Sequence, residues 1–571
     1  MPEQGLHIAD VFVLGLYLIG ITIIGVWAAR RIKNVADFFM PRRFGKAMMI
    51  MHAFGTGTHS DQAVSVASKS YTNGLSGIWY QWLWLFATPF YWLIAPVMRR
   101  FRAITTADVF EARFSPSVAT LFAVVGMLNL AIDIGVILKG SGAVVHASTG
   151  GLVSSNIAIA VMTVMFVIYG MAGGLSAAII TDFIQGVLTI IFSFILLPFI
   201  LKAVGGLAGL HAAIPNAEEM FSLVAPGEIG LFYIVVIALN ALIGIVTQPH
   251  TMGNCAAGKT ETEGRVGWMF GNFIKRFCTI AWCLTGLAAI VYFAGSDVEP
   301  DHIFGLVAAD FLPKILPGIL GLFLAALLAS VMSSCDSFMI ASSGLFTENI
   351  YKRLKPDKTQ RHYVLVARIT SLVIVAGGVA FAYSLPDVVT GLEIFWKVSA
   401  MMGIAFWLGL FWRRTTVAGA WAGTLISFAA LLFTSRIAFG DFVIWDFNAH
   451  LAGRLPTFML WEGELYLPWQ MVFYLTAGLI TGIVVSLLTK PVAREKLDNF
   501  YALMRTPVKP GEQVSVPCTL LADAVVPEKR NIFPNTNLEI PIPSLTSVLG
   551  FLAGWGCVAA IIYSVYLIAK V

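Results

Sequence analysis

The sequence predicts an all-α membrane protein with about 14 transmembrane helices. Of its 571 residues, 58% are hydrophobic and only 12% are charged, whereas soluble domains carry about 25% charged residues. Apolar stretches of roughly 20 residues, long enough to cross a bilayer, recur along almost the whole chain. This composition excludes a large soluble protein. The six scattered cysteines, without a C-x-x-C pair, argue against a disulfide framework or a zinc site.

The predicted spans follow one another with mostly short connections. We place them at residues 9–29, 46–71, 77–98, 118–147, 156–173, 177–201, 230–256, 272–294, 314–350, 363–384, 390–412, 417–434, 468–489 and 544–569. The first span has neither a basic leader nor a small-residue cleavage site. We therefore expect it to be a retained helix and not a signal peptide.

Basic residues are distributed unevenly between the loops. With the N-terminus outside, alternate loops hold most of the 37 Lys and Arg residues, in clusters within 30–46, 99–113, 259–276, 352–368, 413–414 and 490–530. Loops rich in Lys and Arg stay in the cytoplasm. We therefore predict a multi-pass protein of the plasma or inner membrane with both termini outside. The net charge of +5 reflects this topology and does not indicate nucleic-acid binding.

Two spans are interrupted by polar or helix-breaking residues. Residues 55–62 (GTGTHSDQ) place glycines and polar side chains within the second span, and Pro249 removes a backbone donor from the seventh. Irregular backbone at membrane depth is tolerated only inside protein or beside a water-filled cavity. The breaks are five spans apart, which predicts two inverted five-helix repeats, each opening with a discontinuous helix, as in secondary transporters. Two unrelated kinks are the alternative.

The repeats divide the chain into six parts. We predict an extra N-terminal helix with a basic loop (1–45), a first repeat (46–202), a second repeat (203–415), two accessory helices (416–490), a cytoplasmic linker (491–543) and a C-terminal helix (544–571). The linker is polar, contains several prolines and carries no catalytic pattern. We interpret it as a tether or a small capping segment.

A polar stripe runs along the ninth span. Asp336 lies beside four serines whose spacing places them on one helix face: Ser330, Ser333, Ser334 and Ser337. Asp182 and Gln185 offer a second group of oxygen atoms on the sixth span. A carboxylate inside the membrane needs a partner, and mostly neutral oxygen ligands suit a weakly held monovalent cation. The alternative for the serines is that they bond to their own helix.

Residues 253–260 (GNCAAGKT) match the nucleotide-binding P-loop pattern G-x-x-x-x-G-K-[ST]. A P-loop needs a preceding strand and a following helix within an α/β domain. This segment instead ends a membrane span and opens a short loop. We therefore predict that no nucleotide binds here.

Several local motifs resemble the sodium:solute symporter family, which contains bacterial proline and sialic acid symporters and the sodium/glucose cotransporters. They are found, in the family's order, at residues 169–185 (YGMAGGLSAAIITDFIQ), 248–250 (QPH), 329–337 (ASVMSSCDS), 348–352 (ENIYK) and 411–416 (FWRRTT). The resemblance implies a leucine-transporter-like inverted-repeat fold. The fourteenth span is more similar to the sugar cotransporter branch than to the proline branch.

The resemblance also implies that Na+ is held between the first and eighth core helices. Carried over residue by residue, its ligands are carbonyls of Gly55, Thr58 and Ser330 and hydroxyls of Ser333 and Ser334. A second sodium site, known in part of the family, would use Asp182, Ser333, Asp336 and Ser337. Two departures put the solute and the inner gate in question: residues 57–62 are more charged than is usual, and Asn254 replaces a common arginine.

By the same resemblance, the solute binds near the membrane midplane against spans two, three, seven and eleven. The candidate contacts are Asp61, Gln62, Gln81, Gln248, His250, Glu393 and Trp396. The aromatic residues Trp79, Tyr80 and Trp84 either stack on a sugar or anchor the protein at the lipid interface. The carboxylates favour a hydroxyl-rich or cationic solute, whereas Lys139, Lys397 and His250 favour an anion. The sequence thus predicts a small organic solute, with sugars first among the candidates.

Together these features predict a sodium-coupled symporter, not an enzyme, that imports its solute by alternating access. Its expected partners are the solute and the lipid bilayer, with no nucleic acid. Proton coupling through Asp182, Asp336 or Asp61 is one alternative, because carboxylates also carry protons. A transporter-like membrane sensor that signals through a separate partner is another. No arrangement of nucleophile, base and orienting group is recognisable within the spans.

Overall fold

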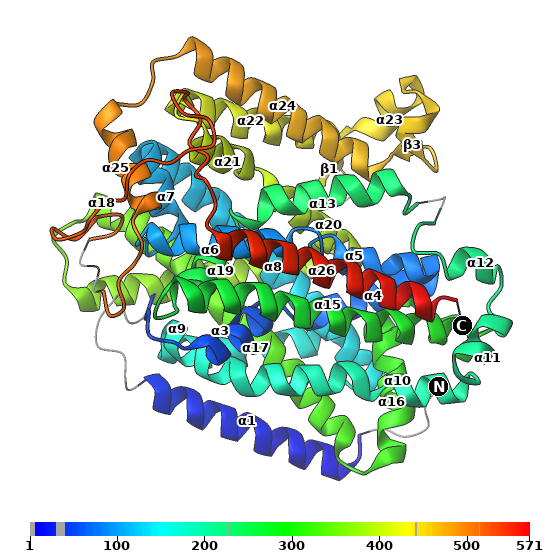
Figure 1. Ribbon diagram of the computed structural model, residues 1–571. Helices are drawn as coiled ribbons and strands as arrows, with labels where there is room; N and C mark the ends of the chain where they lie inside the picture. Colours follow the sequence, from blue (N-terminus) through cyan, green and yellow to red (C-terminus); the bar gives the residue numbers. More distant parts are fainter. Residues whose placement is uncertain are drawn as a thin grey trace.

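The computed structural model describes residues 6–29, 40–225, 228–439, 442–512, 514 and 516–570. These residues form a bundle of long helices (Figure 1). Eight helices are long and apolar enough to cross a membrane, and four shorter apolar helices accompany them. The predicted helical membrane protein is therefore confirmed. The count of 14 spans, the inverted repeat and the six-part division remain predictions.

The first half of the chain forms helices α1 (Ile8–Ala29), α3 (Lys46–Thr56), α4 (Ser60–Asn73), η1 (Gly74–Ile78), α5 (Trp79–Trp82), α6 (Thr88–Arg100), α7 (Thr106–Arg113), α8 (Pro116–Ser148), α9 (Ser155–Ile195), α10 (Leu197–Ala203), α11 (Gly206–Ala213), α12 (Ala217–Met220), α13 (Leu231–Ile245) and α14 (Thr251–Ala256). The second half begins with α15 (Glu261–Tyr292), η2 (Pro300–His302), α16 (Ile303–Ile315), α17 (Ile319–Phe346), η3 (Thr347–Tyr351), α18 (Lys352–Leu354) and α19 (Gln360–Ser384).

The chain then continues through α20 (Val388–Ala400), α21 (Gly403–Phe411) and α22 (Val417–Phe433) to an antiparallel hairpin of β1 (Arg436–Phe439) and β2 (Phe442–Asp446). Next come α23 (Phe447–Leu451), η4 (Ala452–Arg454), η5 (Thr457–Met459) and the two-residue strands β3 (Leu460–Trp461) and β4 (Glu464–Leu465). The last helices are α24 (Leu467–Leu488), α25 (Arg494–Arg505) and α26 (Leu545–Ile568).

Both predicted discontinuities are confirmed. The second span is divided between α3 and α4, with Gly57, Thr58 and His59 outside either helix. The seventh is divided between α13 and α14. Nearby groups satisfy carbonyls freed at each break: Thr58 N–H donates to the Gly55 oxygen at 3.2 Å, and Thr251 Oγ1 donates to the Ile245 oxygen at 3.0 Å. Such local partners allow irregular backbone within a buried helix.

Helix α17 occupies the centre of the bundle, where it packs against α1, α8, α9 and α19. Helix α1 approaches it closely. A Cβ at Gly321 would lie 2.2 Å from the Asp10 carbonyl oxygen, so this crossing requires glycine. The buried Asp10 carboxylate also accepts a bond from Gly321 N–H at 2.8 Å. The extra N-terminal helix is thus packed directly against the helix that carries the serine stripe.

Three local differences from the predicted spans appear. Helix α9 runs through both the fifth and sixth predicted spans, so no interruption marks the expected boundary between them. The eleventh span is interrupted at Met401 and Met402, between α20 and α21. Helix α15 begins at Glu261 instead of residue 272, because Thr260 and Glu263 form a capping box there.

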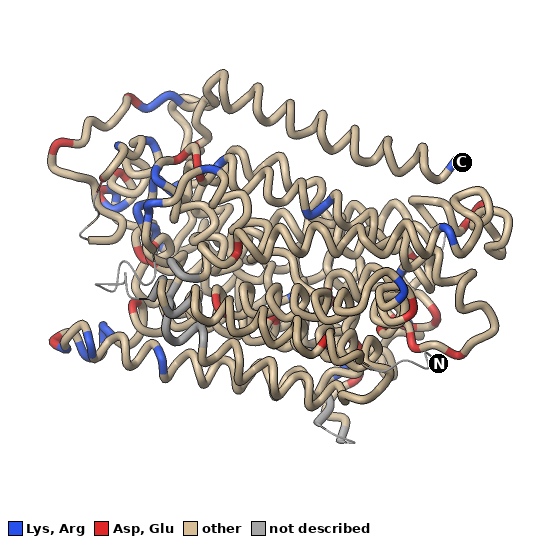
Figure 2. The backbone as a smooth tube through the Cα atoms, turned by 90° about the horizontal axis from the view of Figure 1, so that it is seen from below, with Lys and Arg blue, Asp and Glu red and all other residues tan. Residues whose placement is uncertain are grey.

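Lys and Arg gather mainly at one end of the bundle, and both labelled chain ends lie at the opposite end (Figure 2). The basic residues at 30–39 lie outside the described part of the chain. One element of the predicted loop clusters was wrong: Lys275 and Arg276 are buried within α15 and do not belong to a loop. The orientation of the termini remains a prediction.

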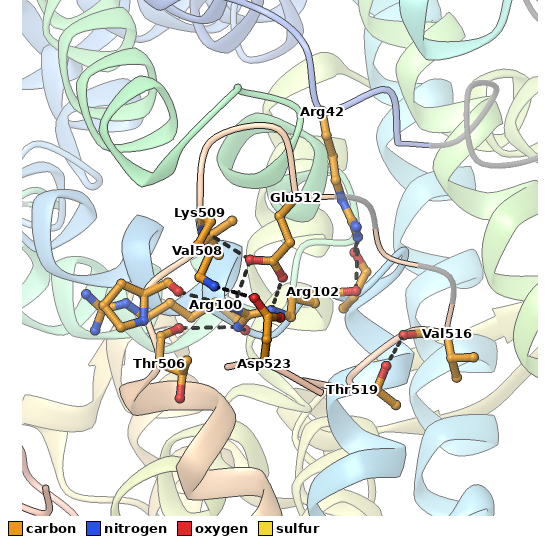
Figure 3. A network of polar contacts seen from close by, with 12 residues as sticks. Arg42, Arg100, Arg102, Thr506, Val508, Lys509, Glu512, Val516, Thr519 and Asp523 are labelled. Atoms are coloured by element: carbon orange, nitrogen blue, oxygen red, sulfur yellow. Dashed lines mark hydrogen bonds and ion pairs between the residues drawn. The ribbon is translucent and has the colours of Figure 1, made fainter. Parts of the chain in front are cut away.

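The linker packs on the basic end of the bundle. Its helix α25 contacts α6 and α7, and Glu512 is buried against Arg102 (Figure 3), with Nη2 donating to Oε2 at 3.1 Å. Burial acts to raise the pKa of Glu512, but the bonds from Arg102 and the Lys509 N–H outweigh it and hold the pKa below its ordinary value. The segment is therefore a cap that is fixed to the helices.

Candidate functional site

Buried oxygen atoms from three distant parts of the chain meet beside the break between α3 and α4. Ser334 Oγ donates to the Gly55 carbonyl oxygen at 3.2 Å, and Ser333 Oγ donates to Asp182 Oδ1. These residues come from α17, α3 and α9, and the two serines and Asp182 are fully buried. A Cβ at Gly55 would lie 3.3 Å from Ser333 Oγ, so glycine allows the close approach. We call Gly55, Asp182, Ser333 and Ser334 the ion cluster.

A histidine that the sequence did not single out completes this arrangement. His52 Nδ1, one turn before Gly55 on α3, donates to Asp182 Oδ2 at 2.6 Å. Thr56 Oγ1 lies 3.1 Å from the same nitrogen. Both oxygens of Asp182 therefore have a partner, which fixes the orientation of the carboxylate toward α3 and α17.

The remaining predicted ion ligands surround the ion cluster without joining its hydrogen bonds. Thr58 Oγ1, Ser337 Oγ and both carboxylate oxygens of Asp336 are buried and have no hydrogen-bond partner. Ser330 Oγ bonds to its own helix at Leu327, which leaves its carbonyl as the predicted ligand. Buried polar groups are ordinarily paired, so these unpaired oxygens mark places where a cation could be held.

Two small cavities flank the ion cluster along α17. One, of about 40 Å³, is lined by residues that include His59, Ser60 and Ser330. The other, of about 30 Å³, is lined by residues that include His52, Thr56 and Ser337. Ser330 and Ser337 are two helical turns apart on one face of α17, and the ion cluster lies between them. The serine stripe thus connects both cavities.

A second polar group surrounds the break itself. His59 Nδ1 donates to Asp61 Oδ1, and Gln62 Nε2 donates to His59 Nε2 at 3.3 Å. The Phe338 ring lies between two histidines, 6.2 Å from the His59 ring and 4.7 Å from the His250 ring, measured between centroids. His250 Nδ1 has no hydrogen-bond partner. Three predicted solute contacts, Asp61, Gln62 and His250, are therefore near this break, with one oxygen or nitrogen each left unpaired.

Three other predicted solute contacts, Gln81, Glu393 and Trp396, lie in an aromatic cluster formed by α5, the turn after it and α20. Tyr80 OH donates to Glu393 Oε1 at 2.9 Å, and the Tyr80 and Trp396 rings are 5.2 Å apart. Trp84 lies 6.2 Å from Trp396. Gln81 Oε1 and Nε2 and the indole nitrogens of Trp84 and Trp396 are buried without hydrogen-bond partners. We call Tyr80, Gln81, Trp84, Glu393 and Trp396 the aromatic cluster; Gln248 is buried separately, at the α13–α14 break.

Lys275 links the two polar regions. Its ammonium donates to the carbonyl of Gly57 in the first break and lies 5.5 Å from the centre of the Trp84 ring. Lys275 was not among the predicted site residues because the basic run at 259–276 was assigned to a loop. Lys275 lies one helical turn before Cys278 and Thr279, and all three are buried in α15. A lysine on the buried face of an apolar helix would have been the available signal.

Residues 253–260 have the context expected for a false P-loop match. They comprise the last four residues of α14 and the short connection to α15, with helix on both sides and no strand directly before them. Thr260, the last residue of the pattern, caps α15 by accepting a bond from Thr262 N–H at 3.2 Å. Its hydroxyl is thus used by the helix.

Broken helices facing buried oxygen atoms at mid-bundle are the architecture of secondary transporters. The similarity of the sequence to known proteins agrees with this class of protein. The model of the sodium:solute symporter family matches residues 38–427. Because this match covers more than half of the sequence, the chain belongs to the sodium:solute symporter family.

Curated relatives and a solved structure are similar over most of the chain. The sodium/glucose cotransporter of Vibrio parahaemolyticus is 26% identical over 76% of this chain and 86% of that protein. The osmoregulated proline transporter OpuE of Bacillus subtilis is 27% identical over 85% of this chain and 96% of that protein. A Na+-coupled sialic acid symporter, solved in a substrate-bound, outward-open state, has a TM-score of 0.70 at 21% identity and covers 85% of this chain and 99% of its own.

Proposed function

We propose that the protein is a sodium-coupled symporter that imports a small organic solute by alternating access between two inverted five-helix repeats. The observation that supports this proposal most directly is the hydrogen bond from Ser334 to the Gly55 carbonyl, beside Ser333 and Asp182. It supports a cation site that depends on α3, α9 and α17 being together. Family membership supports Na+ as the coupling ion.

The donor chemistry of the ion cluster fits Na+. Its candidate ligands are all oxygens, and most are neutral carbonyl or hydroxyl groups. In the described part of the chain, no group of three or more His, Cys, Asp or Glu side chains could hold a metal ion. We propose Gly55, Thr58, Ser330, Ser333 and Ser334 as ligands of a first ion and Asp182, Ser333, Asp336 and Ser337 as ligands of a second.

The energy available from Na+ is sufficient for uptake. One monovalent ion gains about 2.3 kcal/mol from a membrane potential of about 100 mV. A tenfold concentration gradient adds about 1.4 kcal/mol. A single ion could therefore concentrate a neutral solute several hundredfold at the limit. The two cavities that flank the ion cluster support an ion path through it in two steps.

For the solute, we propose contacts from Asp61, Gln62, Gln81, Gln248, His250, Glu393 and Trp396. We add Lys275 to this proposal because its ammonium contacts the Gly57 carbonyl and lies near the Trp84 ring. The aromatic cluster combines ring faces with unpaired amide and indole groups. A hydroxyl-rich solute would pair those groups and stack on the rings. This combination supports a sugar or a related polyol over an apolar solute.

Uptake into liposomes that contain only this protein tests the proposal. Radiolabelled sugars, amino acids and carboxylates would be added at fixed pH with an inward Na+ gradient, or with choline replacing Na+. We expect accumulation of at least one class of solute with Na+ alone. Accumulation that is equal in choline would contradict sodium coupling, and absence of any flux together with solute-induced stabilisation would favour a sensor.

The contact between His52 and Asp182 favours proton coupling as the second candidate function. Histidine and aspartate are side chains that can carry protons, and here they face each other at the ion cluster. In the same liposomes, an inward proton gradient without Na+ distinguishes the two. Proton coupling predicts accumulation under that gradient, whereas sodium coupling predicts none.

A further inference from the structure

A large apolar crevice lies on the side of the bundle, away from the ion cluster. Its volume is about 1190 Å³, which exceeds the range of about 300–1,000 Å³ usual for small-molecule pockets. Its walls are formed by α6, α13, α21 and α24, and residues 532–547 close one end. Figure 1 shows this closing segment running past α21 to the start of α26.

The crevice opens toward lipid. Leu239, Leu479 and Ile542 line it and are 52%, 41% and 59% exposed, respectively. Large apolar side chains left exposed on membrane-spanning helices face acyl chains, which are as apolar as leucine. The walls are therefore suited to acyl chains, and the bilayer supplies these at high concentration.

Polar side chains lie at one end of the crevice. They are Arg100, Arg265, Ser544 and Ser547. Arg100 is neutralised by Glu261, with Nη2 and Oε2 2.9 Å apart. Arg265 forms no ion pair with any described carboxylate. Its Nη2 donates to Ser547 Oγ at 3.3 Å, and its Nε is buried without a hydrogen-bond partner.

Two features prepare Arg265 to bind an anion. The Trp92 ring, 4.9 Å from its guanidinium carbon, supports it from one face. The first turn of the 24-residue helix α26, which starts beside it after Ser544, contributes the positive end of a helix dipole. The crevice thus combines an apolar volume with an arginine at its edge that has no ion-pair partner among the described residues.

We propose that the crevice binds an anionic phospholipid, with its phosphate against Arg265 and Ser547 and its acyl chains along α13 and α24. Basic pockets between membrane helices near the bilayer surface recognise anionic headgroups in this way. The bound lipid would contact α6 together with α13, α21 and α24, and so join segments far apart in the sequence. This assignment does not depend on which solute or ion the protein carries.

Lipid binding to the purified, delipidated protein in detergent tests the proposal without a transport assay. Phosphatidylglycerol and phosphatidylcholine of identical acyl chains would be titrated, and bound lipid counted by native mass spectrometry. We expect phosphatidylglycerol to bind more tightly. The Arg265→Gln variant should bind it about tenfold more weakly, the effect of losing one charge-assisted hydrogen bond.

Two further variants complete the test. Arg361→Gln removes an exposed arginine at the start of α19, outside the crevice, and should bind phosphatidylglycerol as the unmodified protein does. Leu479→Trp narrows the crevice at its α24 wall and should weaken binding of both lipids. Equal binding of the two lipids by the unmodified protein would overturn the headgroup assignment, even if Arg265→Gln failed to fold. Unchanged lipid binding by Leu479→Trp would overturn the placement of the phospholipid in this crevice.

Discussion

The ion cluster and the aromatic cluster are both buried, but they differ in how far their polar groups are hydrogen-bonded. In the ion cluster, Ser333, Ser334 and Asp182 bond to one another or to the backbone across three helices. In the aromatic cluster, the Gln81 amide and two indole nitrogens have no partner. A partnered cluster is held together by its own bonds, whereas an unpaired one carries a desolvation cost that a ligand can relieve. The two regions should therefore respond differently to mutation.

Replacing Asp182 with alanine should have the largest effect. The change leaves His52 and Ser333 without their partner, and breaking a buried charged contact costs about 3–5 kcal/mol. We expect sodium-dependent uptake to fall by more than about 100-fold, since about 1.4 kcal/mol corresponds to a factor of ten. Asp357→Ala, in an exposed turn, is the control. Uptake by Asp182→Ala with unchanged sodium dependence would remove the ion cluster from the mechanism.

The Ser334→Ala variant should raise the Na+ concentration for half-maximal uptake by about tenfold, the effect of one lost oxygen ligand of about 1.4 kcal/mol. The solute concentration for half-maximal uptake at saturating Na+ should change little. Ser342→Ala removes a buried hydroxyl of the same helix that bonds only to Met339 and should behave as the unmodified protein. If both serine variants shift the sodium requirement equally, the shift results from altered helix packing, and Ser334 is not assigned as a sodium ligand.

In the aromatic cluster, Gln81→Leu should change the solute requirement and not the sodium requirement, the reverse of Ser334→Ala. We expect a solute KM about fivefold higher with an unchanged sodium requirement, because one hydrogen bond of about 1 kcal/mol to solute is lost. Without solute, the variant should unfold at a higher temperature, since the unpaired buried amide is gone. Gln360→Leu, at an exposed position, controls for the change in side chain. Lower thermal stability of Gln81→Leu would show that the amide is already satisfied.

Lys259→Gln, in the P-loop-like segment, should have the smallest effect. The described bond of this residue is from its backbone N–H to the Phe44 carbonyl at 3.0 Å, which glutamine preserves. Surface substitutions of this kind change stability by less than about 0.5 kcal/mol, so uptake should change less than about twofold. Fluorescent ATP-analogue binding would be measured alongside. A collapse of uptake with loss of nucleotide binding would restore the P-loop interpretation.

Much of the polar pattern could be predicted because it is local. The spacing of Ser330, Ser333, Ser334 and Ser337 places them on one face of any helix. Two glycines among the polar side chains of residues 55–62 disfavour a continuous membrane helix whatever packs around them. The partners of these groups could not be predicted in the same way. His52 was unremarkable within the second span, and Lys275 was counted with the basic loop cluster 259–276 although it also lies at the start of the predicted span 272–294. The role of His52 became visible where α3 packs against α9, and that of Lys275 where α15 packs beside the break after α3.

The sequence by itself determined which segments are apolar enough to enter the membrane and where two of them break. Hydropathy and missing backbone donors act along a single segment, so neighbours in space are not needed to read them. Only the tertiary structure decided that Gly55, Asp182 and Ser334 meet and that Gln81 remains unpaired. Those outcomes depend on helices more than 100 residues apart approaching within hydrogen-bond distance, and the cost of burying an unpaired polar group makes that approach specific.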